Sequence, residues 1–256
     1  MISMISHDNF NLVCHIWIIF GIALFPVLLK ITQPYGKHTK SSWGPMINNR
    51  LGWLIMELPA LLVFVFFLDF SRSLNNYMVL IAASLWGLHY IHRSLIFPFR
   101  LHTKGEKMPV VIMFSAILFN TVNGFLNGYW LTHFAPGIRA NGSAKFHVIV
   151  GIVLFLAGFV INQFHDRLLI KLREGGIKGY KIPHGGLFKY VSCPNYLGEI
   201  ISWLGYFIVT FGLPALTFLI WTLVNLIPRA IDNHKWYHQN FPDYPEDRKA
   251  VFPYIL

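Results

Sequence analysis

The stretch FNLVCHIWIIFGIALFPVLL, residues 10–29, decides the fold class, and Lys30 follows it directly. A helix of about 20 apolar residues spans the roughly 30 Å hydrocarbon core of a bilayer. No basic residue precedes the stretch, whereas a cleavable signal peptide has a shorter apolar region behind positive charge. We therefore expect a first transmembrane helix with its N-terminus outside, and no signal peptide.

Six further apolar runs predict seven membrane spans in all. A short break, Phe211-Gly212-Leu213-Pro214, separates the last two, because Gly ends helices and Pro starts them. No internal repeat is evident, which disfavours a transporter built from inverted repeats. We expect an all-α integral membrane protein with a single domain over residues 1–256 and seven transmembrane helices at about 10–30, 51–70, 75–97, 109–133, 145–170, 195–213 and 214–234.

The distribution of basic residues predicts the orientation of these spans. Only 12% of the 256 residues are charged and 55% are hydrophobic, whereas soluble domains carry about 25% charged residues. All Lys and Arg except Arg72, Arg139 and Lys145 fall in four alternate gaps between apolar runs, and basic loops stay cytoplasmic. The C-terminus is therefore predicted inside. The net charge of +10 then indicates anionic lipid headgroups or a phosphorylated cofactor as partners, not nucleic acid.

Two polar side chains stand at the same depth in neighbouring spans. Glu57 lies about seven residues past Arg50, roughly 10 Å inside the cytoplasmic boundary. Tyr90 lies at about that depth in the third span and shares a helical face with Trp86 and Arg93. A protonated Glu bonded to another helix and a Tyr anchoring the membrane interface are the structural alternatives. Ionisable groups inside spans are costly and usually functional, so their coincidence favours a site.

Three stripes of polar residues mark the later spans. Each repeats at helical spacing, so its members lie on one face of their helix. A solvated helix end would explain Asp166 and Arg173 but not the deeper Asn162. The stripes are Asn162, Asp166 and Arg173; then Asn195, Glu199 and Ser202; then Asn225, Arg229 and Asn233, with Tyr237 beyond.

These polar residues all lie in the cytoplasmic halves of their spans. A transporter would carry polar groups through the midplane, whereas this pattern predicts a deep pocket that opens to the cytosol and is closed outside. Such a pocket suits an enzyme that takes a soluble cofactor from one side and a lipid-like substrate from the bilayer. His89 and His92 are three residues apart, but no further close pair accompanies them, so we predict no metal site. Cys14 and Cys193 are not expected to form a disulfide.

Several stretches make the chain resemble the steroid 5α-reductases. Residues 180–199, YKIPHGGLFKYVSCPNYLGE, are similar to the C-terminal signature of that family. The similarity extends to PYGKH at 34–38, ELP at 57–59, HYIHR at 89–93, DYP at 243–245 and RKA at 248–250. The resemblance runs in register over almost the whole chain. It implies a seven-helix fold and NADPH-dependent reduction of the C4=C5 double bond of a 3-oxo-Δ4 steroid.

The resemblance also implies residue roles. Glu57 and Tyr90 would be catalytic and grip the substrate carbonyl, and Trp53 would contact the substrate. The implied NADPH contacts are Asn162, Asp166, Arg173, Asn195, Glu199, Arg229, Asn233, Tyr237, Tyr35 and Arg93. Two positions depart from the family pattern: Met56 replaces a common Gln, and Asn233 replaces the His of the mammalian enzymes, with His234 adjacent.

The proposed chemistry agrees with these residue types. A carbonyl-conjugated C=C accepts hydride quickly only when its carbonyl oxygen is polarised, and the Tyr90 hydroxyl is a donor at neutral pH. Glu57 is either a second, protonated donor or the group that orients Tyr90, and both would stabilise the developing enolate. The alternatives are a related reductase of polyprenols or enoyl thioesters, a membrane methyltransferase that uses S-adenosylmethionine, and a sterol-binding protein without enzymatic activity.

The resemblance leads to expectations about partners and location. The partners would be a steroid-like substrate from the bilayer and membrane lipids, with no nucleic acid, and the protein would be a monomer. It would be a multi-pass protein of the inner membrane in a bacterium or of the endoplasmic reticulum in a eukaryote. Its cofactor site would face the cytoplasm. The substrate side would lie mainly in residues 1–110 and the cofactor side mainly in residues 160–256.

Overall fold

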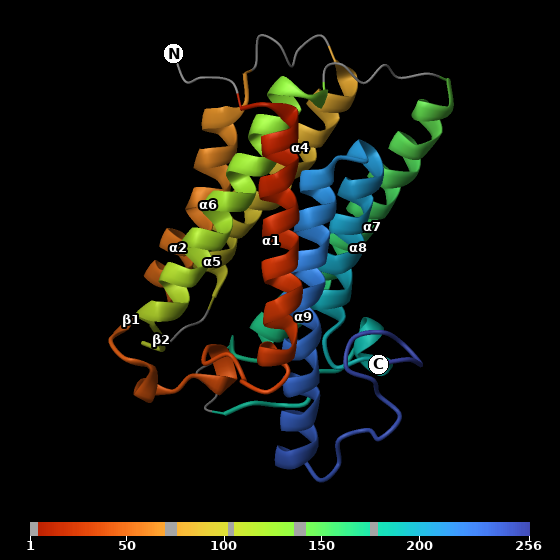
Figure 1. The fold of residues 1–256 in the computed structure, drawn as a ribbon. Helices are drawn as coiled ribbons and strands as arrows, with labels where there is room; N and C mark the ends of the chain where they lie inside the picture. The colour runs from red at the N-terminus through yellow and green to blue at the C-terminus, as the bar shows by residue number, and fades with distance from the viewer. Residues whose placement is uncertain (1–4, 70–75, 102–104, 136–141, 175–178) are drawn as a thin grey trace.

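A computed structural model describes residues 5–69, 76–101, 105–135, 142–174 and 179–256 (Figure 1); Arg72 and Arg139 lie outside them. The described part is almost entirely helical, as predicted. Its longer helices are α1 (His7–Leu28), α2 (Asn49–Phe67), α4 (Tyr77–Ile91), α6 (Val110–His133), α7 (Gly142–Lys171), α8 (Pro194–Thr210) and α9 (Leu213–Asn240). The shorter elements are the 3₁₀ turns η1 (Gly36–His38), η2 (Ser41–Trp43) and η6 (Gly186–Lys189), the π-helical turn η3 (His92–Ile96), α5 (Phe97–Arg100), β1 (Met46–Asn48) and β2 (Lys107–Pro109).

Each predicted span has a helix, but not all of these helices have the length of a membrane span. Among the described residues, α1, α2, α6, α7 and α9 are long and apolar enough to cross a bilayer. The helices α4 and α8 have 15 and 17 residues, although η3 and α5 continue α4 in helical form to Arg100. Large apolar side chains such as Ile19, Phe66 and Val160 are 65–75% exposed, as expected for a surface in contact with lipid. The count of seven crossings stays a prediction.

The boundaries of the last two helices test the local sequence reasoning. Phe211 ends α8 in a left-handed conformation with φ of 44°, and Gly212 caps α9, which begins Leu213-Pro214. The predicted break is therefore confirmed. The helix α9 continues to Asn240, six residues past the expected end at 234. Ring contacts of Trp236 with Tyr180 and of Tyr237 with Tyr244 stabilise this extension. Tyr180 and Tyr244 lie outside α9, so the pattern within the helix did not predict these contacts.

Close helix pairs form the bundle (Figure 1): α7 packs along α8, α2 along α6 and α1 along α9. The α7–α8 pair depends on glycines. A Cβ on Gly205 would collide with the backbone of Phe155, and one on Gly151 would lie 2.7 Å from the Gly205 carbonyl oxygen. The small residues therefore let the two backbones touch, which fixes the polar stripe of α7 against that of α8.

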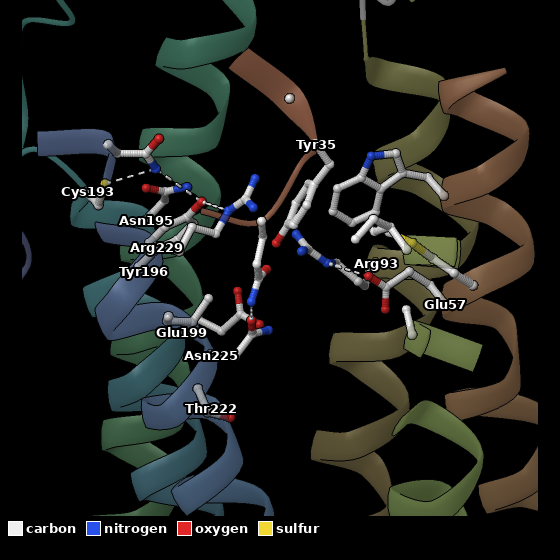
Figure 2. Close-up of a pocket in the computed structure, with 18 of the residues that line it drawn as sticks. Tyr35, Glu57, Arg93, Cys193, Asn195, Tyr196, Glu199, Thr222, Asn225 and Arg229 are labelled. Atoms are coloured by element: carbon white, nitrogen blue, oxygen red, sulfur yellow. Dashed lines mark hydrogen bonds and ion pairs between the residues drawn. The ribbon is translucent and has the colours of Figure 1, made fainter. Parts of the chain in front are cut away.

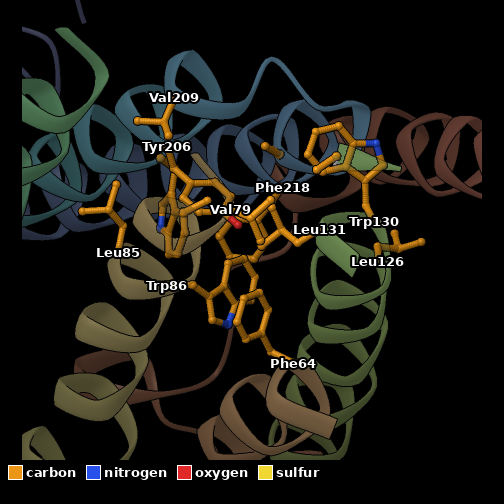
Figure 3. Close-up of a cluster of buried hydrophobic side chains, with 14 of the residues drawn as sticks. Phe64, Val79, Leu85, Trp86, Leu126, Trp130, Leu131, Tyr206, Val209 and Phe218 are labelled. Atoms are coloured by element: carbon orange, nitrogen blue, oxygen red, sulfur yellow. The ribbon is translucent and has the colours of Figure 1, made fainter. Parts of the chain in front are cut away.

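Aromatic side chains fill the core between α2, α4, α8 and α9 (Figure 3). Trp86 of α4 stacks on Phe64 of α2, with ring centroids 5.0 Å apart and an interplanar angle of 12°. It also contacts Trp203 of α8 and Phe218 of α9 at 5.4 and 5.3 Å. These rings are 0–3% exposed. This core joins four helices.

Short pairings organise the opposite end, where the loops and the C-terminal tail lie (Figure 1). The strands β1 and β2 pair antiparallel, with Met46 opposite Pro109, and thereby join the starts of α2 and α6. The tail is held by a bridge between Val191 and Lys249 and by bonds from the amides of Ser192 and Cys193 to the carbonyls of Lys249 and Ala250. Val251 is fully buried, and Phe252 and Leu256 pack against the same apolar cluster, whereas Tyr254 and Ile255 are more than 80% exposed. The prediction that the last residues pack on the helices is therefore confirmed only in part.

The glycine contact leads to a stability prediction. Gly205→Ala should destabilise the protein by roughly 1–3 kcal/mol, the usual range for overpacking, because the added methyl meets backbone rather than a flexible side chain. The control is Gly87→Ala, since a Cβ on Gly87 has nothing within 4 Å. Thermal unfolding in detergent measures both variants. Equal melting temperatures for the two would contradict the proposed contact.

Candidate functional site

A cavity of about 700 Å³ lies inside the helix bundle (Figure 2). Side chains from α1, α2, α4, α6, α7, α8 and α9 and from the loops before η1 and η6 line it. Of the residues expected at the site, the structure brings these to the cavity wall: Tyr35, Trp53, Glu57, Tyr90, Arg93, Asp166, Arg173, Asn195, Glu199, Arg229, Asn233 and Tyr237. Asn162 is the exception, because it stands behind the wall.

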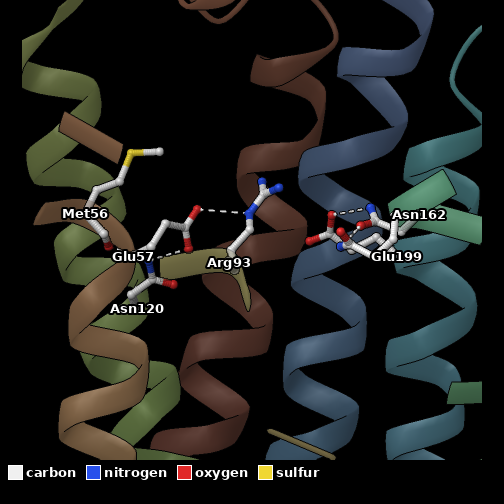
Figure 4. Close-up of polar contacts among 7 residues, drawn as sticks. Met56, Glu57, Arg93, Asn120, Asn162 and Glu199 are labelled. Carbon is white, nitrogen blue, oxygen red and sulfur yellow. Dashed lines mark hydrogen bonds and ion pairs between the residues drawn. The ribbon is translucent and has the colours of Figure 1, made fainter. Parts of the chain in front are cut away.

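One end of the cavity holds an ion pair between Glu57 and Arg93 (Figure 4). The Arg93 Nε donates to Glu57 Oε1 at 3.3 Å. The amide of Asn120, on α6, donates to Glu57 Oε2 at 3.4 Å. Both oxygens of Glu57 therefore accept N–H groups from other helices, which is the arrangement of a carboxylate anion. The ring of Trp53 lies 4.5 Å from the Arg93 guanidinium.

The Tyr90 side chain lies next to this ion pair and is 3% exposed. Its ring packs on Trp86 at 4.9 Å and on Trp203 at 5.9 Å. Among the hydrogen bonds of the described ranges, none involves the Tyr90 hydroxyl, and the residue lines the cavity. The π-helical turn η3 begins two residues later. Tyr90 is thus a rigidly packed phenol with its donor available to a ligand.

The opposite wall is formed where α7 meets α8. The amide of Asn195 donates to Asp166 Oδ1 at 2.9 Å. Asn162 donates to the Asn195 carbonyl at 2.9 Å and to Glu199 Oε2 at 3.5 Å. Asn162 therefore holds two wall residues in place from behind. Glu199 lies across the cavity from Glu57, so carboxylates stand on both sides of Arg93 (Figure 4).

The loop before η1 is fastened to α9 at three successive turns. Gln33 donates to Asn225 Oδ1 at 2.8 Å, and His38 Nε2 donates to Asn233 Oδ1 at 3.2 Å. Between them the Arg229 guanidinium lies 3.1 Å from the centre of the Tyr35 ring (Figure 2). Arg229 Nε also donates to the Tyr196 hydroxyl at 2.7 Å. The polar stripe predicted on α9 therefore holds a loop over the cavity.

Lys37 is a wall residue that the sequence analysis did not single out. Its ammonium lies 3.7 Å from the ring of Tyr237 and 4.6 Å from that of Trp236. Burial lowers the pKa of the Lys37 ammonium to about 7. Tyr180, another unexpected wall residue, lies 4.9 Å from the guanidinium of Arg173. The motif PYGKH contains Lys37, but the predicted topology already explains a basic residue in a loop that is expected to be cytoplasmic, so Lys37 was not singled out.

Different parts of the cavity wall carry different kinds of side chain. Cationic groups gather at one end of it, its mouth, where Lys37, Arg173 and Arg229 line the wall. Arg229 Nη1 is buried without a hydrogen-bond partner in the described part of the chain. Apolar rings such as Phe119, Phe218 and Trp221 line another part. Such an arrangement accommodates an anionic cofactor and an apolar substrate side by side. No group of three or more potential metal ligands occurs among the described residues.

Comparison with known proteins shows a consistent similarity. Residues 106–256 match the pattern of the family described as 3-oxo-5-alpha-steroid 4-dehydrogenase. The chain is 36% identical over 258 residues to steroid 5-alpha-reductase DET2 of Arabidopsis thaliana, with 98% of each chain covered. It is 40% identical over 239 residues to 3-oxo-5-alpha-steroid 4-dehydrogenase 2 of Sus scrofa, covering 91% of this chain and 93% of the relative. The human 3-oxo-5-alpha-steroid 4-dehydrogenase 1 is 35% identical over 238 residues, with 92% and 91% covered.

The aromatic surroundings of Lys37 lead to a prediction about its reactivity. Only a neutral amine reacts with acylating reagents, so labelling of Lys37 should rise with pH through a midpoint near 7, far below the ordinary lysine value of about 10.4. Peptide-resolved mass spectrometry across a pH series measures the midpoint. Trp236→Ala opens the site to water and should move the midpoint upward. A midpoint above about 9.5 in the unmodified protein would show that Lys37 is solvated.

Proposed function

Because the chain belongs to the 3-oxo-5-alpha-steroid 4-dehydrogenase family, whose named members are oxidoreductases, we propose that it reduces the C4=C5 double bond of a 3-oxo-Δ4 steroid with NADPH. One structural observation supports the proposal in addition to the family membership. A single cavity contains Glu57 and Tyr90 at one end, an apolar wall and a cationic mouth. A substrate and a dinucleotide bound there would share one enclosed space.

The residues present fit a phosphorylated dinucleotide. Lys37 and the buried Arg229 Nη1 are cationic donors without an ionic partner in the described ranges, and phosphate oxygens would supply the missing acceptors. Arg173 stands at the same mouth. Polar groups of Asp166, Asn195 and Glu199 would bind the amide and sugar portions. NADPH would supply the hydride, and the protein would supply orientation and electrostatics.

At the other end, the Tyr90 hydroxyl would donate to the C3 carbonyl oxygen of the steroid. This bond would stabilise negative charge as hydride reaches C5, the β-carbon. The resulting enolate would then take a proton at C4 from water. Because Glu57 accepts bonds from Arg93 and Asn120, we assign it the role of an anionic acceptor that orients the donors around that oxygen. The apolar rings of Phe119 and Phe218 would pack on the steroid.

The substrate would come from the bilayer. The cavity wall includes Phe20 and Val27 of α1 and Leu118 of α6, which are 51%, 45% and 59% exposed on the lipid-facing surface. An apolar molecule could therefore pass from lipid to the cavity between these helices without crossing water. This access favours a steroid-like substrate over a soluble one.

We propose the following arrangement in the membrane. The chain is a monomer with one domain and seven crossings, with the N-terminus outside and the C-terminus in the cytoplasm. It would lie in the inner membrane of a bacterium or the endoplasmic reticulum of a eukaryote. Residues 1–110 contribute mainly to the substrate side and residues 160–256 mainly to the cofactor side. The five long apolar helices support a membrane protein. The orientation is supported by basic residues in the segments that follow α1 and precede α6, which lie at the same end of the bundle as β1 and β2 (Figure 1).

The catalytic assignment predicts the effect of two conservative changes. Glu57→Gln and Tyr90→Phe should each cut single-turnover reduction of a 3-oxo-Δ4 steroid by at least about 10²-fold, the range for losing one oxyanion donor or its orienter. The double variant should be little worse than the worse single one, because both act on one oxygen. Tyr129→Phe is the control, since that buried hydroxyl bonds the Ile5 amide at the other end of the bundle. Near-normal turnover by Tyr90→Phe would contradict the assignment.

The cationic mouth predicts cofactor choice and pH dependence. NADPH should bind more tightly than NADH, and Lys37→Gln should weaken NADPH by about tenfold, the loss of one phosphate contact. The ammonium that attracts phosphate is lost as pH rises through about 7, so NADPH affinity should fall above that pH in the unmodified protein and stay flatter in Lys37→Gln. Equilibrium binding measures this. Equal affinity for NADH, or thermal stabilisation by S-adenosylmethionine and not NADPH, would reject the cofactor assignment.

A further inference from the structure

The helix α2 is continuous past Glu57, but it lacks one hydrogen bond of its ladder there. Pro59 has no N–H, so the carbonyl of Ile55 lacks the helical donor it would otherwise receive from position 59. Side chains of two other helices donate to carbonyls of α2 on either side of Pro59. Asn120 Nδ2 of α6 donates to the Met56 oxygen at 2.6 Å, and Trp86 Nε1 of α4 donates to the Ala60 oxygen at 3.0 Å. Tertiary contacts therefore reinforce α2 where its own ladder is broken.

The same Asn120 amide also reaches the Glu57 carboxylate, at 3.4 Å from Oε2 (Figure 4). Both of its partners are acceptors, so the nitrogen of the amide must point toward α2. Asn120 is 3% exposed and lines the cavity. One amide group thus fixes both the backbone that carries Glu57 and one of the two oxygens of Glu57. Arg93 fixes the other oxygen.

Two further asparagines on α6 show what a purely structural role looks like. Asn123 donates to the Phe119 carbonyl at 2.8 Å and Asn127 to the Asn123 carbonyl at 3.0 Å, both within α6 itself. Both are buried, at 0% and 2% exposure, and neither is among the residues that line the cavity. Asn120 differs because its donor leaves its own helix and ends on α2.

From this geometry we infer that Asn120 is a positioning residue of the reductase, which holds the Glu57 carboxylate in the orientation used at the substrate carbonyl. The inference rests on the proposed function. Without the amide, Glu57 keeps only the Arg93 contact and is free to rotate toward that guanidinium. The Met56 carbonyl then loses a donor beside Pro59, so the segment that carries Glu57 is less well ordered. Both effects misplace the same carboxylate.

The kinetic test compares Asn120→Ala with Asn123→Ala, the same change one turn along α6. Asn120→Ala should lower single-turnover steroid reduction by about tenfold or more and leave NADPH affinity within about twofold. In a Glu57→Gln background, Asn120→Ala should lower the rate of single-turnover reduction by less than about threefold, because Asn120 acts through Glu57. Asn123→Ala should be near wild type in both backgrounds. Asn120→Leu keeps the volume of the side chain and should reproduce the loss if the alanine variant is poorly folded.

A spectroscopic test separates the inference from the reductase proposal. The infrared carboxylate band that Glu57→Gln removes should shift in Asn120→Leu and stay in place in Asn123→Ala. An unshifted band, or equal kinetic losses with and without Glu57, overturns the positioning role. If the unmodified protein binds NADPH but does not reduce the steroid, the proposed function fails instead, and the band shift alone decides whether Asn120 holds Glu57.

Discussion

The pairing of Arg93 with Glu57 is the constraint on which the site depends. A buried charge that loses its partner destabilises a protein by roughly 3–5 kcal/mol. Here Arg93 donates to Glu57, and its guanidinium lies 4.5 Å from the ring of Trp53 and 5.0 Å from that of Phe97. These contacts set the position of the end of α4 against α2. Tyr90, three residues before Arg93, is thereby brought to the cavity wall.

The second constraint is the backbone contact between α7 and α8. Because glycines remove side-chain bulk on both helices, Asn162 reaches the Asn195 carbonyl and Asn195 reaches Asp166. A wider separation would leave these polar groups without partners in an apolar bundle, which is costly. The pair therefore forms a rigid polar wall opposite Glu57. The cavity is the space that remains between this wall and the ion pair.

The local sequence pattern was sufficient to predict most of the helices and several of the faces that line the site. The apolar runs located the helices, and helical spacing put Asn162 on the face of Asp166 and Asn195 on that of Glu199. Pattern was insufficient for Asn120, because it is followed by Asn123 and Asn127 in the same apolar run, and spacing alone does not distinguish the three. Lys37 was missed for a similar reason: a loop lysine has no periodic neighbours, and only its three-dimensional surroundings reveal the aromatic rings.

The sequence by itself determined the helical class, the end of the bundle that holds the polar chemistry and, through its motifs, the family. These follow from hydropathy, charge distribution and residue order, which are local properties. Tertiary structure alone decided the partners: Glu57 binds Arg93 and Asn120 rather than standing free beside Tyr90, and Arg229 lies against Tyr35 of a distant loop. Helical spacing specifies the face on which a side chain lies, but the packing of another helix or loop specifies what that face meets.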